Sequence, residues 1–221
     1  SGPESWGPTL VNIFFGAWFG RILLETGITS TIIRKTVELG GDRPFITMAL
    51  LSAVVSIIFT SMQGAGPVIA IGVIVLPILM SIGVPKTLAL VNYMGSIGAG
   101  LLLNPVIFTQ YNAIMAMGGE ITYTFEDYYK FGIVCLIVQL IIVVIMSGIV
   151  LKKRKTSRAW AVNNKPVDDG KNAPGISLIC VIFPVLFVIL FKLPVIVGFI
   201  FASFYALLTC GKLKKYEDAS S

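Results

Sequence analysis

Long uncharged stretches alternate with short charged ones along the whole chain. Residues 44–85 and 87–119 contain no Asp, Glu, Lys or Arg. Because a helix rises about 1.5 Å per residue, roughly 20 apolar residues cross the hydrocarbon core of a bilayer. Further apolar stretches of helical length lie at residues 9–26, 129–151, 176–191 and 194–210. This pattern predicts an all-α integral membrane protein with about five transmembrane helices, formed by these stretches together with the longer ones.

Residues 43–84 place a polar, glycine-rich centre between two apolar arms. The centre reads Thr-Ser-Met-Gln-Gly-Ala-Gly-Pro at positions 60–67. A tip exposed to lipid would leave backbone N–H and C=O groups unpaired, so we expect it in water or against protein. The stretch predicts a re-entrant helical hairpin whose tip forms a binding site. The alternative is two ordinary spanning helices joined by an aqueous loop.

Residues 86–117 are too long and too polar for one simple span. They carry several glycines and asparagines, and Pro105 follows Asn104 near the middle. Proline removes a backbone donor and clashes with the preceding turn, while glycine permits an unwound backbone. We therefore expect a discontinuous transmembrane helix. A proline-kinked helix with polar residues facing its neighbours is the alternative.

Charged residues indicate the orientation. Residues 28–40 alternate in the manner of an amphipathic helix lying in the membrane interface. Lys and Arg precede the hairpin at Arg34, Lys35 and Arg43 and follow it at Lys86. The run Lys-Lys-Arg-Lys at 152–155 begins a basic loop, 152–172. The excess of basic residues predicts that both hairpin ends, this loop and the C-terminus are cytoplasmic.

Composition supports a single membrane domain over residues 1–221. Hydrophobic residues make up 56% of the chain and charged residues 13%, well below the quarter usual in soluble domains. The net charge of +6 lies in short loops. Orientation explains it better than a nucleic-acid or phosphoinositide partner. The sequence shows no phosphate-binding loop, metal-ligand cluster or nucleophile–base pair, so we expect neither an enzyme nor a cofactor.

The order of elements resembles the ion transporter superfamily, in particular its gluconate permease and citrate transporter families. Three stretches carry the resemblance: residues 16–44, the Thr-Ser-Met-Gln-Gly tip with Leu-Pro-Ile at 76–78, and Gly-Ser-Ile-Gly at 95–98 with Asn104-Pro105. The tip differs from the Ser-Asn-Thr of the dicarboxylate branch. The resemblance implies a secondary transporter, a symporter of a small organic anion such as gluconate, citrate or another carboxylate, in the cytoplasmic membrane.

In that superfamily the hairpin tip and the broken helix face each other at the substrate and cation site. The candidate binding residues are Thr60, Ser61, Gln63, Gly64, Asn92, Gly95, Ser96, Gly98, Asn104, Pro105 and Thr109. Helix starts near Gly64 and Pro105 would hold the anion. Oxygens of Ser61, Gln63, Ser96 and Asn104 are candidate ligands for Na⁺. The site has no ionisable side chain that could relay a proton, which favours coupling to Na⁺. The resemblance to gluconate permeases instead favours coupling to H⁺.

Superfamily members usually pair two inverted repeats, and this chain has one hairpin and one broken helix. Residues 176–208 resemble the start of a second repeat. We therefore expect the chain to work with a second half-transporter or the rest of a longer chain. The alternatives are a non-transporting scaffold or regulatory subunit and a channel-forming subunit.

Overall fold

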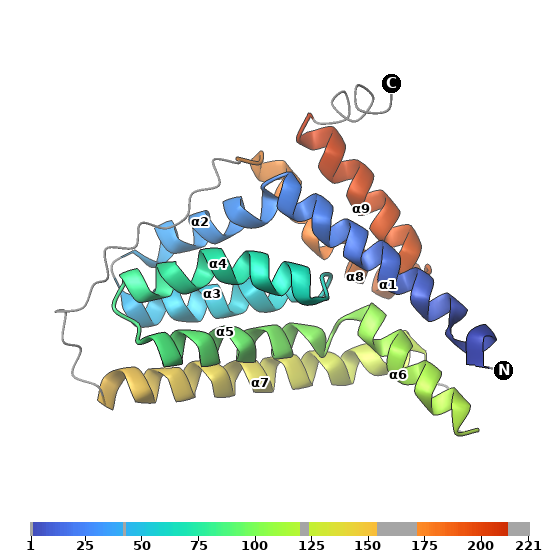
Figure 1. Ribbon diagram of the computed structural model, residues 1–221, viewed down its shortest axis with the longest axis horizontal. Helices are drawn as coiled ribbons and strands as arrows, with labels where there is room; N and C mark the ends of the chain where they lie inside the picture. Colours follow the sequence, from blue (N-terminus) through green and yellow to red (C-terminus); the bar gives the residue numbers. More distant parts are fainter. Residues whose placement is uncertain (1, 42, 120–123, 154–171, 212–221) are drawn as a thin grey trace.

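The computed structural model describes residues 2–41, 43–119, 124–153 and 172–211, and over these ranges it is all-helical (Figure 1). The predicted all-α class is therefore confirmed. In chain order the elements are α1 (Gly2–Glu25), α2 (Ile28–Gly40), α3 (Pro44–Phe59), α4 (Ala65–Ser81), α5 (Lys86–Leu101), α6 (Pro105–Met117), α7 (Phe125–Lys153), the 3₁₀ helix η2 (Gly175–Ile182), α8 (Phe183–Phe191) and α9 (Val195–Thr209).

The helices form two packed regions that meet at the middle of the molecule (Figure 1). In one region α5 packs against α3, α4 and α7, and α2 covers α3. In the other, α9 packs against α1 and α8, and α1 also contacts α6. The core contains large buried side chains from both regions, among them Phe19, Phe59, Tyr93 and Phe199. The turn between α3 and α4 and the break between α5 and α6 both lie where the regions meet.

Helices α3 and α5 run parallel and are joined by hydroxyl and amide groups. Ser52 Oγ lies 2.9 Å from Asn92 Oδ1, and one turn further Ser56 Oγ donates to the Ser96 carbonyl at 2.8 Å. Both pairs are 40 residues apart in sequence, so the two helices keep one register. A third helix joins because Asn92 Nδ2 donates to Ser147 Oγ of α7 at 3.1 Å. All five side chains are buried.

The stretch predicted to be a discontinuous helix forms two helices with a break between them. Helices α5 and α6 meet at a 65° bend, separated by residues 102–104. Pro105 is the first residue of α6, where its missing N–H costs no intrahelical bond. The Leu102 carbonyl at the break accepts a 2.7 Å hydrogen bond from the Tyr128 hydroxyl of α7. The Leu102 carbonyl therefore keeps a hydrogen-bond partner although the helix is interrupted there.

Only part of the predicted set of spans has full spanning length. Of the described helices, α7 is the one that by itself is long and apolar enough to cross a membrane, and the bent α5–α6 pair would be a second. Helix α7 runs from Phe125 to Lys153 and is longer at both ends than the predicted helix 129–151. The other apolar segments, α3, α4, η2 with α8, and α9, have 17 residues or fewer. Helix α1 has 24 residues but does not meet the same test.

The predicted helix 176–191 is not one α-helix. It is the 3₁₀ helix η2 followed by α8, in which Pro184 occupies the first turn. Proline cannot donate the bond that would continue an α-helix through this point, so a new helix begins there. A 3₁₀ helix rises about 2.0 Å per residue, so the 17 residues reach about 29 Å instead of about 25 Å. The tighter helix gives a short segment nearly the length of a span.

The predicted amphipathic helix 28–40 coincides with α2. Its buried face carries Ile28 and Ile33 but also Thr29, Thr31 and Thr36, and it packs against α3. Hydroxyls of Thr31 and Thr36 donate back to carbonyls one turn earlier, which satisfies them inside the contact. Residues 154–171 of the predicted basic loop lie outside the described ranges.

We expect Gly100→Ala to destabilise the protein by about 1–3 kcal/mol, because its Cβ would collide with the Ser56 carbonyl oxygen and approach Phe59 Cβ to 2.9 Å. Gly66→Ala is the matched control, since a Cβ there meets nothing within 4 Å. The free energy of unfolding of both variants is measured in detergent micelles. Equal stability of the two variants would contradict close packing of α3 on α5.

Candidate functional site

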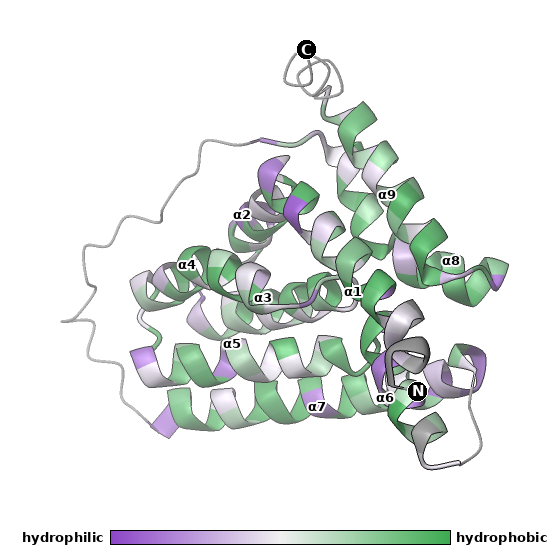
Figure 2. Cartoon of the chain, turned by 45° about the vertical axis from the view of Figure 1, so that its right-hand side comes forward, coloured by the Kyte–Doolittle hydropathy of each residue, from purple (hydrophilic) through white to green (hydrophobic). Residues whose placement is uncertain are grey.

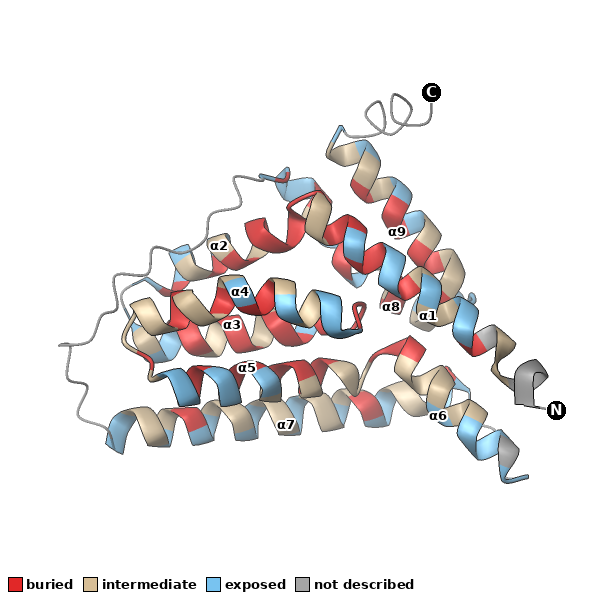
Figure 3. Ribbon diagram, in the orientation of Figure 1, coloured by how far each residue is buried: buried red, intermediate tan, exposed pale blue. Residues whose placement is uncertain are grey.

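The tip of the hairpin is a buried turn of polar residues. Thr60, Ser61 and Gln63 are 6%, 0% and 7% exposed, and Met62 is fully buried between them. The tip lies against α1, because a Cβ on Gly20 would touch Met62 and Pro67 at 3.4 Å. Figure 3 shows this buried turn leading directly into the exposed first turn of α4. Of the two expected surroundings of the tip, protein covers its first half, residues 60–63.

Asn104 joins the hairpin tip to the broken helix. Its Nδ2 donates to the Phe59 carbonyl at 3.0 Å and to the Met62 carbonyl at 3.1 Å. Its Oδ1 accepts from the backbone N–H of Val106 at 2.9 Å and of Ile107 at 3.4 Å, which caps α6. One side chain that is 1% exposed thus uses both ends of its amide. It supplies partners for two carbonyls at one interruption and two N–H groups at the other.

The two predicted anion-binding helix starts therefore differ. At α6 the free N–H groups are occupied by Asn104 Oδ1. At α4 the preceding residue is Gly64, with φ of 97° and no side chain to cap the helix. Gly64, Ala65 and Gly66 are exposed. The first backbone N–H groups of α4 and the positive end of its dipole consequently remain open to a ligand, and those of α6 do not.

Two buried side-chain oxygens at the tip have no hydrogen-bond partner in the part of the chain that the structure describes. They are Ser61 Oγ and Gln63 Oε1. A buried polar group without a partner costs about 1–3 kcal/mol. By contrast, the neighbouring Thr60 hydroxyl donates to the Ile57 carbonyl at 2.7 Å. Ser61 and Gln63 directly precede Gly64 and the uncapped start of α4, so a ligand that reached them from there would give both oxygens partners.

Four predicted site residues lie away from the tip, along α5. Asn92 and Ser96 belong to the contacts with α3 and α7, and the Ser96 hydroxyl donates to the Asn92 carbonyl at 2.7 Å. Gly95 and Gly98 make room for α7, since added Cβ atoms would come within 2.6 Å of Val143 and 2.7 Å of Gln139. Asn92 is nine residues before the end of α5 at Leu101, about 14 Å along the helix. Its side chain is used in the contact between helices.

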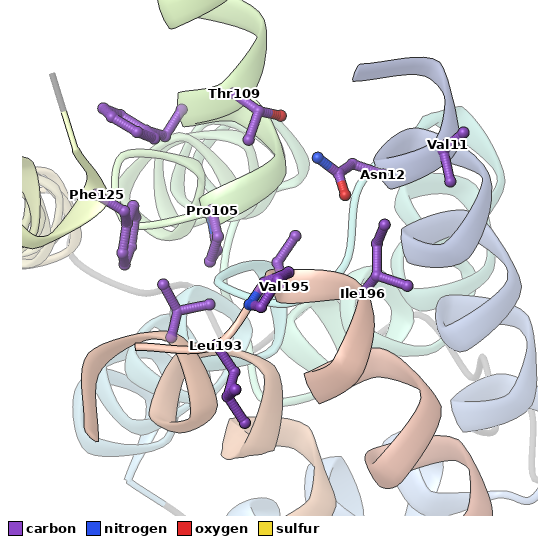
Figure 4. A pocket seen from close by; sticks show the side chains of 11 residues that line it. Val11, Asn12, Pro105, Thr109, Phe125, Leu193, Val195 and Ile196 are labelled. Atoms are coloured by element: carbon purple, nitrogen blue, oxygen red, sulfur yellow. The ribbon is translucent and has the colours of Figure 1, made fainter. Parts of the chain in front are cut away.

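Thr109 lies on α6, where its hydroxyl donates to the Val106 carbonyl at 2.7 Å. With Pro105 it lines a cavity of about 530 Å³ between α6, α1 and the α8–α9 turn (Figure 4). The other lining residues are mainly apolar, and Asn12 of α1 adds a polar end on the same side as Thr109. Ser61 and Gln63 are not among the lining residues. This cavity is therefore separate from the tip.

Sequence reasoning missed the partners that hold the site in place. Ser52 and Ser56 are one helical turn apart, as are Asn92 and Ser96. Two such pairs at matching spacing are the signal that could have placed α3 beside α5. Gln139, whose Nε2 donates to the Gly95 carbonyl at 3.2 Å, was a lone polar residue within an apolar span. Tyr93 was also missed, and its hydroxyl donates to the Val68 carbonyl of α4 at 2.6 Å.

Discontinuous helices that form a binding site at a break are a feature of many secondary transporters. Comparison with protein families gives the particular family: residues 6–219 match the model described as citrate transporter (CitMHS). The chain belongs to this family. The resemblance to the citrate and gluconate permease-like proteins of the ion transporter superfamily is thereby confirmed.

Family membership indicates a multi-pass membrane protein of the secondary transporter type. It also favours a non-enzymatic function. Neither the curated proteins nor the solved structures that were searched include a match.

We expect Asn104→Ala to lower the free energy of unfolding by about 2–4 kcal/mol, because it removes a helix cap and leaves two buried carbonyls unpaired. Asn104→Asp keeps a cap for α6 but turns an oxygen toward the Phe59 and Met62 carbonyls, so it should also destabilise. The matched control on α6 is Thr109→Val, expected to cost less than about 0.5 kcal/mol. Unfolding in micelles and amide hydrogen exchange at the tip measure these effects. A loss below that of the control would contradict the bridging role.

Proposed function

We propose that this chain forms part of a secondary active transporter, a symporter that carries a small organic anion such as citrate, gluconate or another carboxylate with Na⁺ or H⁺. The observation that carries the proposal is the juxtaposition at the hairpin tip. Two buried oxygens that have no partner among the described residues belong to Ser61 and Gln63, which directly precede the helix start of the tip region that no side chain caps. Membership in the citrate transporter family supports the substrate class.

The anion would bind at the start of α4. A carboxylate accepts hydrogen bonds, and the first backbone N–H groups of α4 at Ala65 and Gly66 are donors without a capping side chain. Glycine at 64 and 66 allows close approach, because added Cβ atoms there would meet nothing within 4 Å. The Ser61 hydroxyl is a further donor. The other predicted helix start, at Pro105, is excluded from this role because Asn104 already fills it.

The coupling cation would bind to oxygens. Ser61 Oγ and Gln63 Oε1 are the two tip oxygens without partners, and neutral oxygens are ligands that hard cations prefer. Of the other predicted sodium ligands, Asn104 uses its oxygen to cap α6, and Ser96 lies along α5. Coupling to H⁺ would instead require an ionisable group, which no residue of the tip supplies. The transport experiment below distinguishes the two ions.

The hairpin is proposed to be re-entrant. Its arms of 16 and 17 residues reach about 24–26 Å, less than the roughly 30 Å hydrocarbon core. The open end carries Arg43 before α3 and Lys86 at the start of α5, and α7 ends there with Lys152 and Lys153 (Figure 1). We place the protein in the cytoplasmic membrane. By the positive-inside rule, the cytoplasmic side would then hold this end of the bundle, residues 152–172 and the C-terminus.

A second membrane unit is proposed to complete the site, either the rest of a longer chain or a second half-transporter. The start of α4 is exposed at residues 64–66, so the described chain would cover one side of the ligand and leave the other side open. The exposed apolar face continues along α4 at Ile69 and Val73, which are 65% and 51% exposed. An apolar surface beside an open polar site is suited to packing against another helix bundle.

Ser61→Ala and Gln63→Met should each reduce uptake at least tenfold, since each removes an oxygen that contacts the ligand at a cost of about 1.5–3 kcal/mol. The full-length protein is reconstituted in proteoliposomes and tested with labelled citrate, gluconate and lactate under Na⁺ or H⁺ gradients. The free energy of unfolding should stay unchanged or rise by up to about 1 kcal/mol, because each variant removes a buried polar atom that has no partner.

Ser81→Ala is the matched control on the same hairpin. The Ser81 hydroxyl donates to the Ile78 carbonyl at 2.7 Å at the far end of α4, so uptake should not change. Wild-type uptake by both tip variants would refute the site assignment. Loss of stability in step with loss of uptake would show that the two side chains are structural.

A further inference from the structure

A groove of about 630 Å³ lies between the start of α3 and the last turns of α7, at the basic end of the bundle. Its walls are apolar side chains, including Phe45 of α3 and Ile145 and Ile149 of α7. These three are 44%, 54% and 47% exposed. Gly148 lets the Phe45 ring lie against α7, since a Cβ there would be 2.7 Å from Phe45 Cε2. The groove has the volume of a small-molecule site and opens to the outside of the bundle.

Basic residues surround one end of this groove. Lys152 lines it, Lys153 follows on the last turn of α7, and Arg43 directly precedes the lining residue Pro44. All three are exposed. None of them forms an ion pair with a carboxylate of the residues that the structure describes. Figure 2 shows the contrast, with a hydrophilic end on α7 and mainly hydrophobic residues along the rest of the same helix.

We propose that this groove binds an anionic phospholipid, with an acyl chain between α3 and α7 and the headgroup phosphate on Lys152, Lys153 and Arg43. The apolar walls match a hydrocarbon chain, and the unpaired cations at one end match a phosphate by charge. Lys and Arg form short, charge-assisted hydrogen bonds to phosphate oxygens. Basic residues at the cytoplasmic end of a span attract anionic lipids. The inference rests on the membrane placement that the family implies and not on the transport mechanism.

Binding at this position would connect the lipid to the transport elements. Phe45 is in the first turn of α3, and the same helix ends at the hairpin tip. Helix α7 is hydrogen-bonded to α5 through Ser147, which directly precedes the groove residue Gly148. A lipid that spans α3 and α7 therefore stabilises the contact among the three helices that position the tip and the break.

The test measures lipid binding to the delipidated full-length protein by native mass spectrometry and by the shift in its thermal unfolding temperature. Phosphatidylglycerol should bind at least fivefold more tightly than phosphatidylcholine and should raise the unfolding temperature. The double variant Lys152→Gln/Lys153→Gln should lose this preference, and Ile145→Trp, which fills the groove, should weaken binding of both lipids at least fivefold. Free glycerol phosphate, which has the headgroup charge and no acyl chain, should not bind measurably.

Two matched variants on α7 are the controls. Lys130→Gln removes an exposed charge near the other end of the helix, and Ile141→Trp enlarges a side chain that is 51% exposed and does not line the groove. Both should bind phosphatidylglycerol like the wild type. Equal loss in Lys130→Gln, or binding of glycerol phosphate as tight as that of the lipid, would overturn the proposal. The proposal would also be overturned if the lipid-free protein were a dimer that Ile145→Trp dissociates, because a second copy of the chain would then occupy the groove.

Discussion

The amide of Asn104 is the contact on which the centre of the molecule depends. A hairpin turn and a helix break within an apolar bundle each leave backbone groups that cannot pair within their own helix, and water is not there to replace them. Asn104 supplies N–H donors to one interruption and an oxygen acceptor to the other. An amide is suited to this position because it carries both kinds of group on one short side chain. The two irregular segments are thereby held together as one unit.

The same contact determines which helix end remains available. Because α6 is capped by Asn104 and α4 follows a glycine, the positive end of only one of these two helices is open. Ser61 and Gln63 next to it keep oxygens unpaired at a cost in stability. Retaining such atoms is the expected cost of a site that is completed by a ligand. In the proposed mechanism the anion and the cation offset that cost when they bind.

The polar contacts among α3, α5 and α7 extend this unit along the bundle. Serine and asparagine side chains connect the three helices at 2.8–3.1 Å, and closely packed glycines bring the backbones together. Within a membrane, hydrogen bonds and close packing replace the hydrophobic effect as the forces between helices. These contacts therefore join the first arm of the hairpin and the first half of the broken helix in one register. The proposed lipid groove lies on the outside of these same helices, at the end opposite the tip.

Much of this architecture could be predicted from the sequence, because uncharged length, glycine and proline placement and clusters of basic residues act locally. Such patterns predict the two hairpin arms and the amphipathic helix 28–40, which coincide with helices of the structure. They also predict the break before Pro105, which lies between α5 and α6. The 3₁₀ helix at Gly175–Ile182 does not follow, because its apolar residues are equally compatible with an α-helix.

The composition of the site was decided only by the tertiary structure. The sequence determined a polar tip and a polar break, but it treated Asn92, Ser96, Asn104 and Ser61 as equivalent ligand candidates. Packing separated them: Asn92 connects helices, the Ser96 hydroxyl donates within its own helix, Asn104 caps a helix and bridges the tip, and Ser61 keeps an oxygen without a partner among the described residues. The physical reason is that a side chain's hydrogen bonds depend on which backbone groups lie within about 3 Å, and residues 40 or more positions apart supply them.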